Sequence, residues 1–461
     1  MEWSGGGVAE SGHVIKRIVV SMPSFAKPVL ATLIAVLGIL SIRRLIQYFS
    51  PEYIHQKDFI QEYLLAKAVL AGTDPYAPLP DLAARFLGPI STAVFLHPTP
   101  HPPAVGLLFS PLGLLSYQHA VQTWFVIQLA LVAASVYGVL RCLELRPAPF
   151  IVLSCSFLAV TWSPFFQDLV LGQLMTLKLA LLIGTWYLLK TGREAGGGFF
   201  LGAAIAIKFI AWPLVFLLAM QKRWKAVVAA GLTVLAANGV AAMVIGSDAV
   251  IAYYTKVGPL VSSLYRGHAS NFSVWGIAGR LFAGTDSPVM CGVKAAPVWS
   301  APELAGTLAF IAPVVVLGAG LFASARLSRS SFDAPFALMV SVSILISPVA
   351  WNCYLVLAAI PAALVAKRLG DQQFPVVPTN AALMAGAFLM VPPTTLNRLM
   401  IGMGNPASAG ACHPVVPFPV TAISLVPLAG MLGLMWLVWT LEHLSVRNEV
   451  VDVQRAMGLR G

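Results

Sequence analysis

Charged side chains are scarce in this sequence. Only 10% of its 461 residues are Asp, Glu, Lys or Arg, whereas 58% are hydrophobic, and the mean hydropathy is +0.82. A chain with so few charges does not cover a soluble surface of this size, and no polar stretch is long enough to form a separate soluble domain. The composition therefore predicts an integral membrane protein with one polytopic domain.

Cysteines and paired acidic residues are also few, which argues against several kinds of site. The five cysteines form no CxxC motif and no metal-ligand spacing. There is no DxD or ExD pair, since Ile60 stands two residues after Asp58, so the paired oxygen ligands of Mg²⁺ or Mn²⁺ are missing there. No Walker A motif or strand-linked GxGxxG is present. We therefore expect no metal and no cofactor.

The basic residues outnumber the acidic ones, for a formal net charge of +11. They lie in short clusters beside apolar stretches, which favours contact with anionic lipid headgroups over nucleic acid. Placing these clusters in the cytoplasm makes both termini cytoplasmic and residues 51–102, 247–301 and 403–416 external. The pairs Arg43–Arg44 and Arg141–Arg146 oppose this scheme in the first half.

The expected organisation is a cytoplasmic tail at 1–27, a transmembrane domain at 28–441 and a second cytoplasmic tail at 442–461. The N-terminal segment lacks the pattern of a cleaved signal peptide, so the first span is expected to be an uncleaved anchor. Cys291 and Cys412 both fall in external loops, where an oxidising compartment permits a disulfide. Free thiols remain the alternative, because sequence does not give their distance.

Hydrophobic stretches predict an all-α bundle of 10 to 12 transmembrane helices, although several stretches are shorter than a straight span needs. Prolines interrupt or flank them, and broken helices at membrane depth are tolerated where protein or a cavity covers the freed backbone groups. A bundle that contains a cavity is therefore expected. The stretches lie near 28–48, 103–117, 119–140, 149–166, 171–189, 198–219, 224–246, 302–325, 335–350, 352–366, 381–402 and 417–440.

The first external loop contains the segment DFIQEYLLAKAVL, which begins at Asp58. Its apolar residues repeat at helical spacing, while Asp58 and Glu62 share another face one turn apart. This pattern predicts an amphipathic helix on the membrane surface, placed as a lid over an interfacial cavity. Asp58 has two interpretations: a carboxylate kept for chemistry, or a cap for the start of this helix.

Other polar residues recur near the predicted membrane ends, and each has an ordinary explanation. Gln173 is suited to hydrogen bonding between helices, Lys208 to reaching the interface, and Asn271 to capping a turn. Lys208 fits its explanation least well, because it stands some ten residues inside an apolar stretch and needs an anionic partner. A phosphate group in the cavity is such a partner.

Six short motifs in one order resemble glycosyltransferase family 87, within the GT-C membrane glycosyltransferases. They are DFxxxYxxAxAVLAGTDPY, HPPAVGLLFSPLGLL, LGQ, AIKFxxWPLVFLLAMQKRWKA, NFSVWGIAGRL and SPVAWNCY, and they cover about residues 50–366. Within that family the chain looks like the polyprenol-phosphate-mannose-dependent α-(1,2)-mannosyltransferases. The resemblance implies a GT-C bundle in the cell membrane of a bacterium, with an extracytoplasmic active site that moves a hexose from a polyprenyl phosphate to a lipid or glycan acceptor.

The resemblance also implies roles for particular residues. Asp58 falls on the family's loop aspartate and would be the general base, with inversion at the anomeric carbon. Lys208 and Arg266 are the candidates to stabilise the leaving phosphate. The further candidates for binding the donor phosphate or sugar are Gln173, Asn271 and Asn352, and the accessory candidates are His97, His101, Glu62 and Tyr63.

One departure from the family pattern stands after SP-x-x-W. Many members have a His pair there, whereas this chain has Asn352, Cys353 and Tyr354. His97 and His101 are candidate substitutes, although a polar loop rim explains them slightly better. A transporter or flippase of a lipid-linked substrate is the alternative function, but we find no internal repeat. An inactive scaffold is a third.

Overall fold

The computed structural model describes residues 26–50, 53–90, 94–286, 289, 291–328, 331–403 and 413–456. Within them the chain is helical, with isolated bridges as the sole β-structure. The first helices are α2 (Ala26–Gln47), η1 (Ile54–Gln56), α3 (Phe59–Leu70), α4 (Leu79–Phe86), α5 (Pro103–Gly113), α6 (Tyr117–Cys142), α7 (Pro149–Thr161), α8 (Ser163–Leu171), α9 (Met175–Lys190), α10 (Glu194–Ile207) and α11 (Pro213–Met220).

The second half begins with a long helix and contains the remaining elements. They are α12 (Trp224–Ile245), α13 (Ser247–Ala252), η2 (Tyr253–Val257), α14 (Gly258–Arg266), α15 (Val274–Phe282), α16 (Pro302–Leu327), α17 (Asp333–Leu345), η3 (Asn352–Ala358), α18 (Ala359–Asp371), α19 (Val376–Met390), α20 (Pro393–Gly402), η5 (Phe418–Leu425) and α21 (Val426–Ala456). The expected all-α class is confirmed.

By length and composition, five of the helices in the described residues are able to cross a membrane. The number rises to seven if each of two bent pairs, α7–α8 and α19–α20, is one span. This is fewer than the 10 to 12 spans expected, because several apolar stretches fold into short helices such as α10 and α17. The chain is therefore a multi-pass membrane protein that also contains short and broken helices.

Prolines mark the breaks, as the sequence indicates. Both bent pairs turn by 80°, and Pro164 and Pro393 stand in the first turns of α8 and α20. A third break separates α10 from α11, where residues 208–212 are not helical and Pro213 begins the next helix. Proline fits the first turn of a helix because its missing N–H needs no partner there. The breaks after α8 and α10 leave polar residues at the ends of apolar helices.

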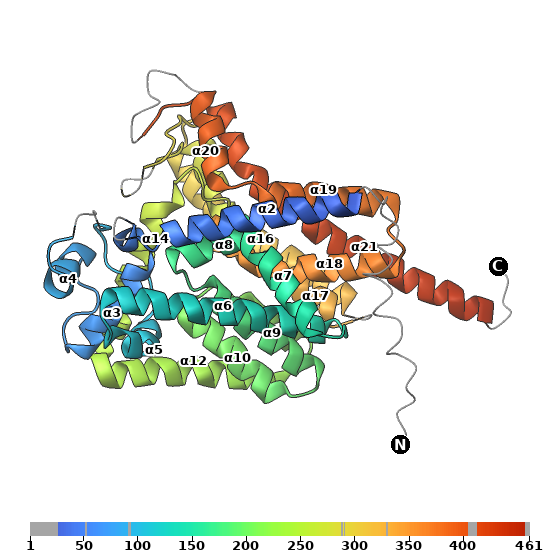
Figure 1. Cartoon of the computed structure of the whole chain (residues 1–461), viewed down its shortest axis with the longest axis horizontal. Coiled ribbons are helices and arrows are strands. Elements are labelled where there is room, and N and C mark those ends of the chain that lie inside the picture. Colours follow the sequence, from blue (N-terminus) through green and yellow to red (C-terminus); the bar gives the residue numbers. More distant parts are fainter. Residues whose placement is uncertain are drawn as a thin grey trace.

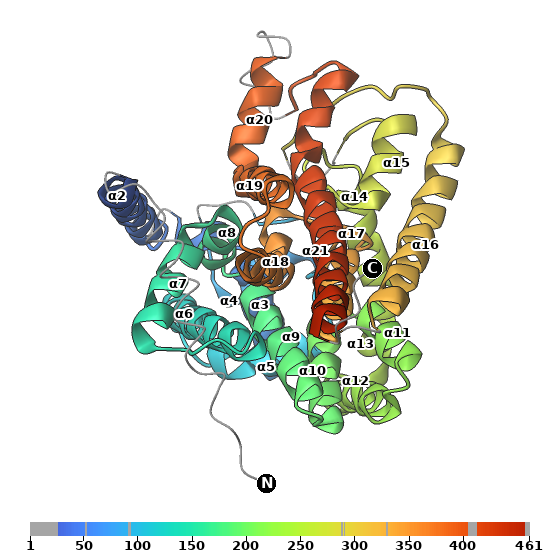
Figure 2. The same ribbon diagram turned by 90° about the vertical axis from the view of Figure 1, so that its right-hand side faces the viewer.

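The helices form two groups (Figures 1 and 2). In one, α9 packs against α6 and α10, and α10 packs against α12. In the other, α17 packs against α16, α18 and α21. Contacts of η3 with α8 and α9 join the groups. Small residues allow the closest approach: a Cβ on Gly198 or Gly202 of α10 would meet the carbonyl oxygens of Ala226 and Ala230 at 2.2 and 2.5 Å.

Helix α3 is not the amphipathic surface helix that we expected from its sequence. Ten of its twelve residues are buried, and Phe59 at its start stacks on Trp124 of α6 with ring centroids 6.3 Å apart. Its polar face is covered by other protein segments rather than by solvent. The amphipathic helix of this region is α4, which buries Leu79 and Leu82 and exposes Asp81 and Arg85.

Three further expectations concern the C-terminal tail, the N-terminal tail and the disulfide. Residues 442–456 of the expected C-terminal tail continue helix α21, and residues 1–25 lie outside the described residues. Cys291 is disulfide-bonded, whereas Cys142, Cys155 and Cys353 are free. Its expected partner Cys412 lies outside the described residues, next to a segment at 413–416 that pairs with Lys294.

Candidate functional site

Asp58 lies immediately before helix α3, and its side chain does not cap that helix. Its Oδ2 instead accepts a hydrogen bond from Nε2 of Gln173 at 2.5 Å. Protein atoms crowd the carboxyl group although part of the residue remains accessible. The capping interpretation is therefore not what this structure shows: the carboxylate points toward a partner 115 residues away in sequence.

The environment of Asp58 favours its protonated form relative to water. Burial raises the pKa of Asp58 from its ordinary value of 3.8 to about 6, and the charge of Glu62 adds to the increase. The hydrogen bond from Gln173 and the charge of Lys208 act in the opposite direction. With this pKa the carboxyl group is mostly ionised at neutral pH. The pKa is also close to the value that suits a general base.

Gln173 stands in the turn between α8 and α9, and two side-chain hydrogen bonds hold this turn. Gly172 adopts φ = 71°, a left-handed conformation that favours glycine. The indole N–H of Trp124 donates to the Gly172 carbonyl at 2.9 Å, and Nε2 of Gln128 donates to the Gln173 carbonyl at 2.9 Å. Both donors come from α6. The turn is therefore fixed before any ligand binds.

Glu62 follows Asp58 by one helical turn and is completely buried. Nε2 of His101 lies 2.9 Å from its Oε1, and the histidine side chain is itself only 2% exposed. These two accessory candidates lie within hydrogen-bond distance of each other inside the protein, where substrate has no access to Glu62. Their place beside Asp58 makes them part of its electrostatic surroundings, since both charges act on its pKa.

Lys208 ends helix α10 in an extended conformation, with φ = −161°. Its Nζ lies 4.6 Å from the centre of the Tyr354 ring, and its charge acts on both Asp58 and the buried Asp168. The helix break explains this position, because it brings a cation to the end of an apolar helix. Tyr354 belongs to the NCY segment that departs from the family pattern. The structure thus brings Asp58, Gln173 and Lys208 into one site.

The remaining candidates have partners within the chain. The Asn271 amide donates to the carbonyls of Arg266 and Pro348 and accepts from two backbone N–H groups, so it joins two loops. The Arg266 guanidinium lies 4.8 Å above the Trp275 ring. Nδ2 of Asn352 donates to Ser163 Oγ at 3.2 Å. None of these contacts of Asn271, Arg266 and Asn352 involves Asp58.

Tyr63 and His97 also have hydrogen-bond partners within the protein. The Tyr63 hydroxyl donates to the Leu115 carbonyl at 2.9 Å. His97 Nδ1 lies 2.7 Å from the Pro98 carbonyl and Nε2 lies 2.6 Å from the Tyr265 hydroxyl. Burial raises the pKa of Tyr265, and the charge of Asp58 raises it further. His97 therefore contacts Tyr265, whose pKa responds to the charge of Asp58.

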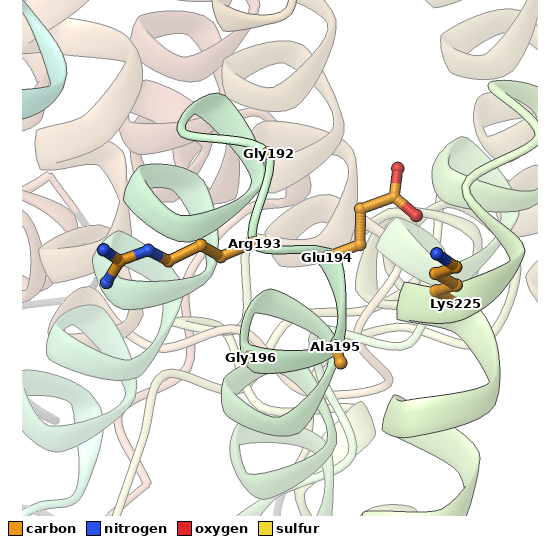
Figure 3. A pocket seen from close by; sticks show the side chains of 6 residues that line it. All are labelled: Gly192, Arg193, Glu194, Ala195, Gly196 and Lys225. Atoms are coloured by element: carbon orange, nitrogen blue, oxygen red, sulfur yellow. The ribbon is translucent and has the colours of Figure 1, made fainter.

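Two further features bear on ligands. Among the described residues, no group of three or more His, Cys, Asp or Glu side chains is arranged to hold a metal ion. A surface pocket of about 570 Å³ is lined by Arg193, Glu194 and Lys225 together with small residues, and Figure 3 shows Glu194 and Lys225 turned toward each other. It lies at the start of α10, the opposite end of that helix from Lys208, so it is separate from the Asp58 site.

The sequence interpretation missed two buried charges beside the site, Asp168 and Lys178. Both are 0% exposed. A signal for them is present in the sequence, since each is a single charge within an apolar run, in PFFQDLVLGQ and MTLKLALL. A charge in such a run is costly and needs a partner, as is the case for Lys208.

The multi-pass helical bundle brings together a partly accessible carboxylate before α3, an amide in the turn between α8 and α9, and a lysine at the end of α10. A sequence model of glycosyltransferase family 87 matches residues 99–348, more than half of the chain. The chain belongs to this family, and the protein is a glycosyltransferase. No curated protein sequence matches it. The match begins after Asp58 and includes Gln173, Lys208 and Arg266.

Proposed function

We propose that this glycosyltransferase moves a hexose, with mannose the first choice, from a polyprenyl-phosphate carrier to a lipid or glycan acceptor. The observation that carries the proposal is Asp58 itself: a partly accessible carboxylate with a pKa of about 6, held by Gln173 and near Lys208. The proposed location is the cell membrane of a bacterium, with the site on the extracytoplasmic side. Membership of a glycosyltransferase family argues against the transporter and scaffold alternatives.

The proposed step is a single displacement. The acceptor hydroxyl oxygen forms a bond to the anomeric carbon of the donor sugar as its proton passes to the Asp58 carboxylate. The bond between that carbon and the phosphate oxygen breaks, and polyprenyl phosphate leaves with the electron pair. Attack from the face opposite the leaving group inverts the anomeric centre. A general base of this kind contributes on the order of 10²–10⁴-fold to the rate.

Lys208 supports the leaving-group half of this step. Negative charge grows on the phosphate oxygen as the bond breaks, and a fixed cation stabilises it most strongly where water is excluded. Lys208 is positioned by a helix end and an aromatic ring rather than by a salt bridge to a single carboxylate. Arg266 is the second cation, with the Trp275 ring orienting its guanidinium.

The test uses the full-length protein in lipid nanodiscs, with polyprenyl-phosphate mannose and polyprenyl-phosphate glucose labelled in the sugar. Sugar is expected to pass to a lipid or glycan fraction, and Asp58→Asn is expected to abolish transfer without lowering expression. Asp81→Asn, an exposed acid on α4, is the matched control. Transfer retained by Asp58→Asn would show that Asp58 is not the base. Activity lost to a chelator and restored by Mn²⁺ would contradict the metal-independent step.

A further inference from the structure

Asp168 and Lys178 are two ionisable side chains with no exposed surface, so neither is accessible to a substrate. A buried charge is costly unless hydrogen bonds or an opposite charge compensate it. Asp168 is near the end of α8, and Lys178 is in the first turn of α9. Their partners show which parts of the site they hold.

The Asp168 carboxylate closes the turn that carries Gln173. Its Oδ1 accepts from the Met175 N–H at 3.0 Å, and its Oδ2 accepts from the Thr176 N–H at 3.1 Å and the Thr176 hydroxyl at 2.5 Å. These N–H groups are at the start of α9, where backbone donors lack helical partners and negative charge is favoured. Its backbone carbonyl accepts from the Gln173 N–H at 2.9 Å.

The side-chain amino group of Lys178 holds the end of α10 that carries Lys208. It donates to the Ala204 carbonyl at 2.6 Å and to the Lys208 carbonyl. Carbonyls in the last turn of a helix lack partners, and a cation is favoured there. Lys208 leaves the helix in an extended conformation at this point, so the Lys178 contact fixes the backbone from which the Lys208 side chain departs.

We propose that Asp168 and Lys178 are positioning residues for sugar transfer: Asp168 holds Gln173 against Asp58, and Lys178 holds Lys208 beside them. Asp168 binds the first turn of α9 from α8, and Lys178 belongs to that turn, so one helix end sets the two groups that flank the base. The proposal rests on the proposed function for its catalytic meaning, but the contacts themselves are tested independently of activity.

The decisive readout is the pH at which Asp58 changes charge. The hydrogen bond from Gln173 lowers the pKa of Asp58, so a displaced Gln173 raises it. The charges that act on Asp58 are those of Glu62, Lys208 and His101, and Asp168 is not among them. An upward change in Asp168→Asn therefore has to come through Gln173. The other groups that act on or respond to Asp58 are Glu62, His101, Lys208, Tyr117, Tyr265, Cys353 and Tyr354.

The experiment is an infrared pH titration of the purified full-length protein, following the carboxyl stretching band that Asp58→Asn removes. Gln173→Met is expected to raise the midpoint by about one pH unit, since a hydrogen bond to a charged group is of that strength. Asp168→Asn is expected to raise it by a similar amount, and the double variant by no more. Thr176→Val, which weakens the same anchor, serves if Asp168→Asn does not fold.

Asp333→Asn is the matched control. Asp333 accepts from the Trp186 indole N–H and from Lys190 at the other end of α9, so its loss perturbs the same helix far from Gln173. An unchanged midpoint in Asp168→Asn and Thr176→Val, or additive changes with Gln173→Met, would overturn the Asp168 assignment. If Asp58→Asn retains transfer, the proposed base fails, whereas the infrared result still decides whether Asp168 holds Gln173.

The Lys178 half has its own test in transfer kinetics. Lys178→Met is expected to lower kcat about tenfold in the wild-type background and to have little further effect on a Lys208→Met variant, because both changes remove the same cation from its place. Lys190→Met, at the far end of α9, is the control. Equal losses from Lys178→Met in both backgrounds would show that it acts independently of Lys208.

Discussion

The buried carboxylate of Asp58 should make the folded protein less stable at neutral pH than an uncharged variant. The pKa of Asp58 is about 6 in the folded protein against an ordinary value of 3.8. Well below pH 3.8 the carboxyl is protonated in both the folded and the unfolded states and carries no penalty. As the pH rises from 4 to 6, the unfolded chain releases the proton first, so folding loses stability.

The size of this effect follows from the two pKa values. Each pKa unit corresponds to 1.36 kcal/mol, so the full penalty above pH 6 is about 3 kcal/mol. Asn has nearly the shape of the protonated acid, and its Oδ1 still accepts from Gln173. Asp58→Asn is therefore expected to abolish transfer and yet raise the apparent unfolding temperature at pH 8, by on the order of 3 °C for a chain of this size.

The assay is thermal unfolding of the full-length protein in nanodiscs at pH 8 and pH 5, at one heating rate. The stabilisation by Asp58→Asn should shrink at pH 5, where the folded wild-type protein is mostly protonated at this site. Asp81→Asn, an exposed acid on α4, should show neither effect. Equal or lower stability of Asp58→Asn at pH 8 would refute the claim that burial strains this carboxylate.

Three further predictions concern the same site. Sugar transfer should rise with pH through a midpoint of about 6, because Asp58 accepts a proton only after it has lost its own; a flat profile between pH 5 and 7.5 would contradict this. Lys208→Met should lower kcat about 10²-fold with a smaller change in KM, since the cation acts on the leaving phosphate, whereas a pure KM effect would indicate ground-state binding. His101→Ala should destabilise the protein by about 3–5 kcal/mol, because it leaves the Glu62 charge buried without its partner. Glu62→Gln combined with His101→Ala should recover much of that loss in chemical unfolding, and no recovery would show that His101 acts through packing instead.

Much of the site was accessible from sequence because its residues are costly where they stand. Asp58 is a carboxylate close to an apolar span, and Lys208 is a cation inside one, so each required a functional or structural partner. Gln173 was selected with them, and the structure brings the three together. Asp168 and Lys178 follow the same rule, so the sequence contained their signal as well.

Other assignments failed or changed because they depend on distant segments. The helical spacing of the segment after Asp58 is compatible with a surface helix, but α3 is covered by α5 and by Tyr117 and Trp124 of α6. Asn271 looked available for a ligand, yet its four hydrogen bonds join two loops. Periodicity reports which faces of a helix are apolar, not which other segments cover the polar one.

The sequence by itself determined that the protein lies in a membrane and that its fold is a helical bundle. With 10% charged residues, long apolar stretches and prolines at their ends, the chain has to be a membrane bundle with broken helices, since that outcome depends on local composition. The tertiary structure alone decided that Asp58 faces Gln173, that Glu62 pairs with His101, and that α9 holds both flanks of the site. The contacts of Gln173 with Asp58 and of Lys178 with Ala204 join residues 115 and 26 positions apart, and that of Asp168 with Met175 joins the ends of two helices. Their geometry depends on how whole helices pack, and no local sequence pattern encodes that packing.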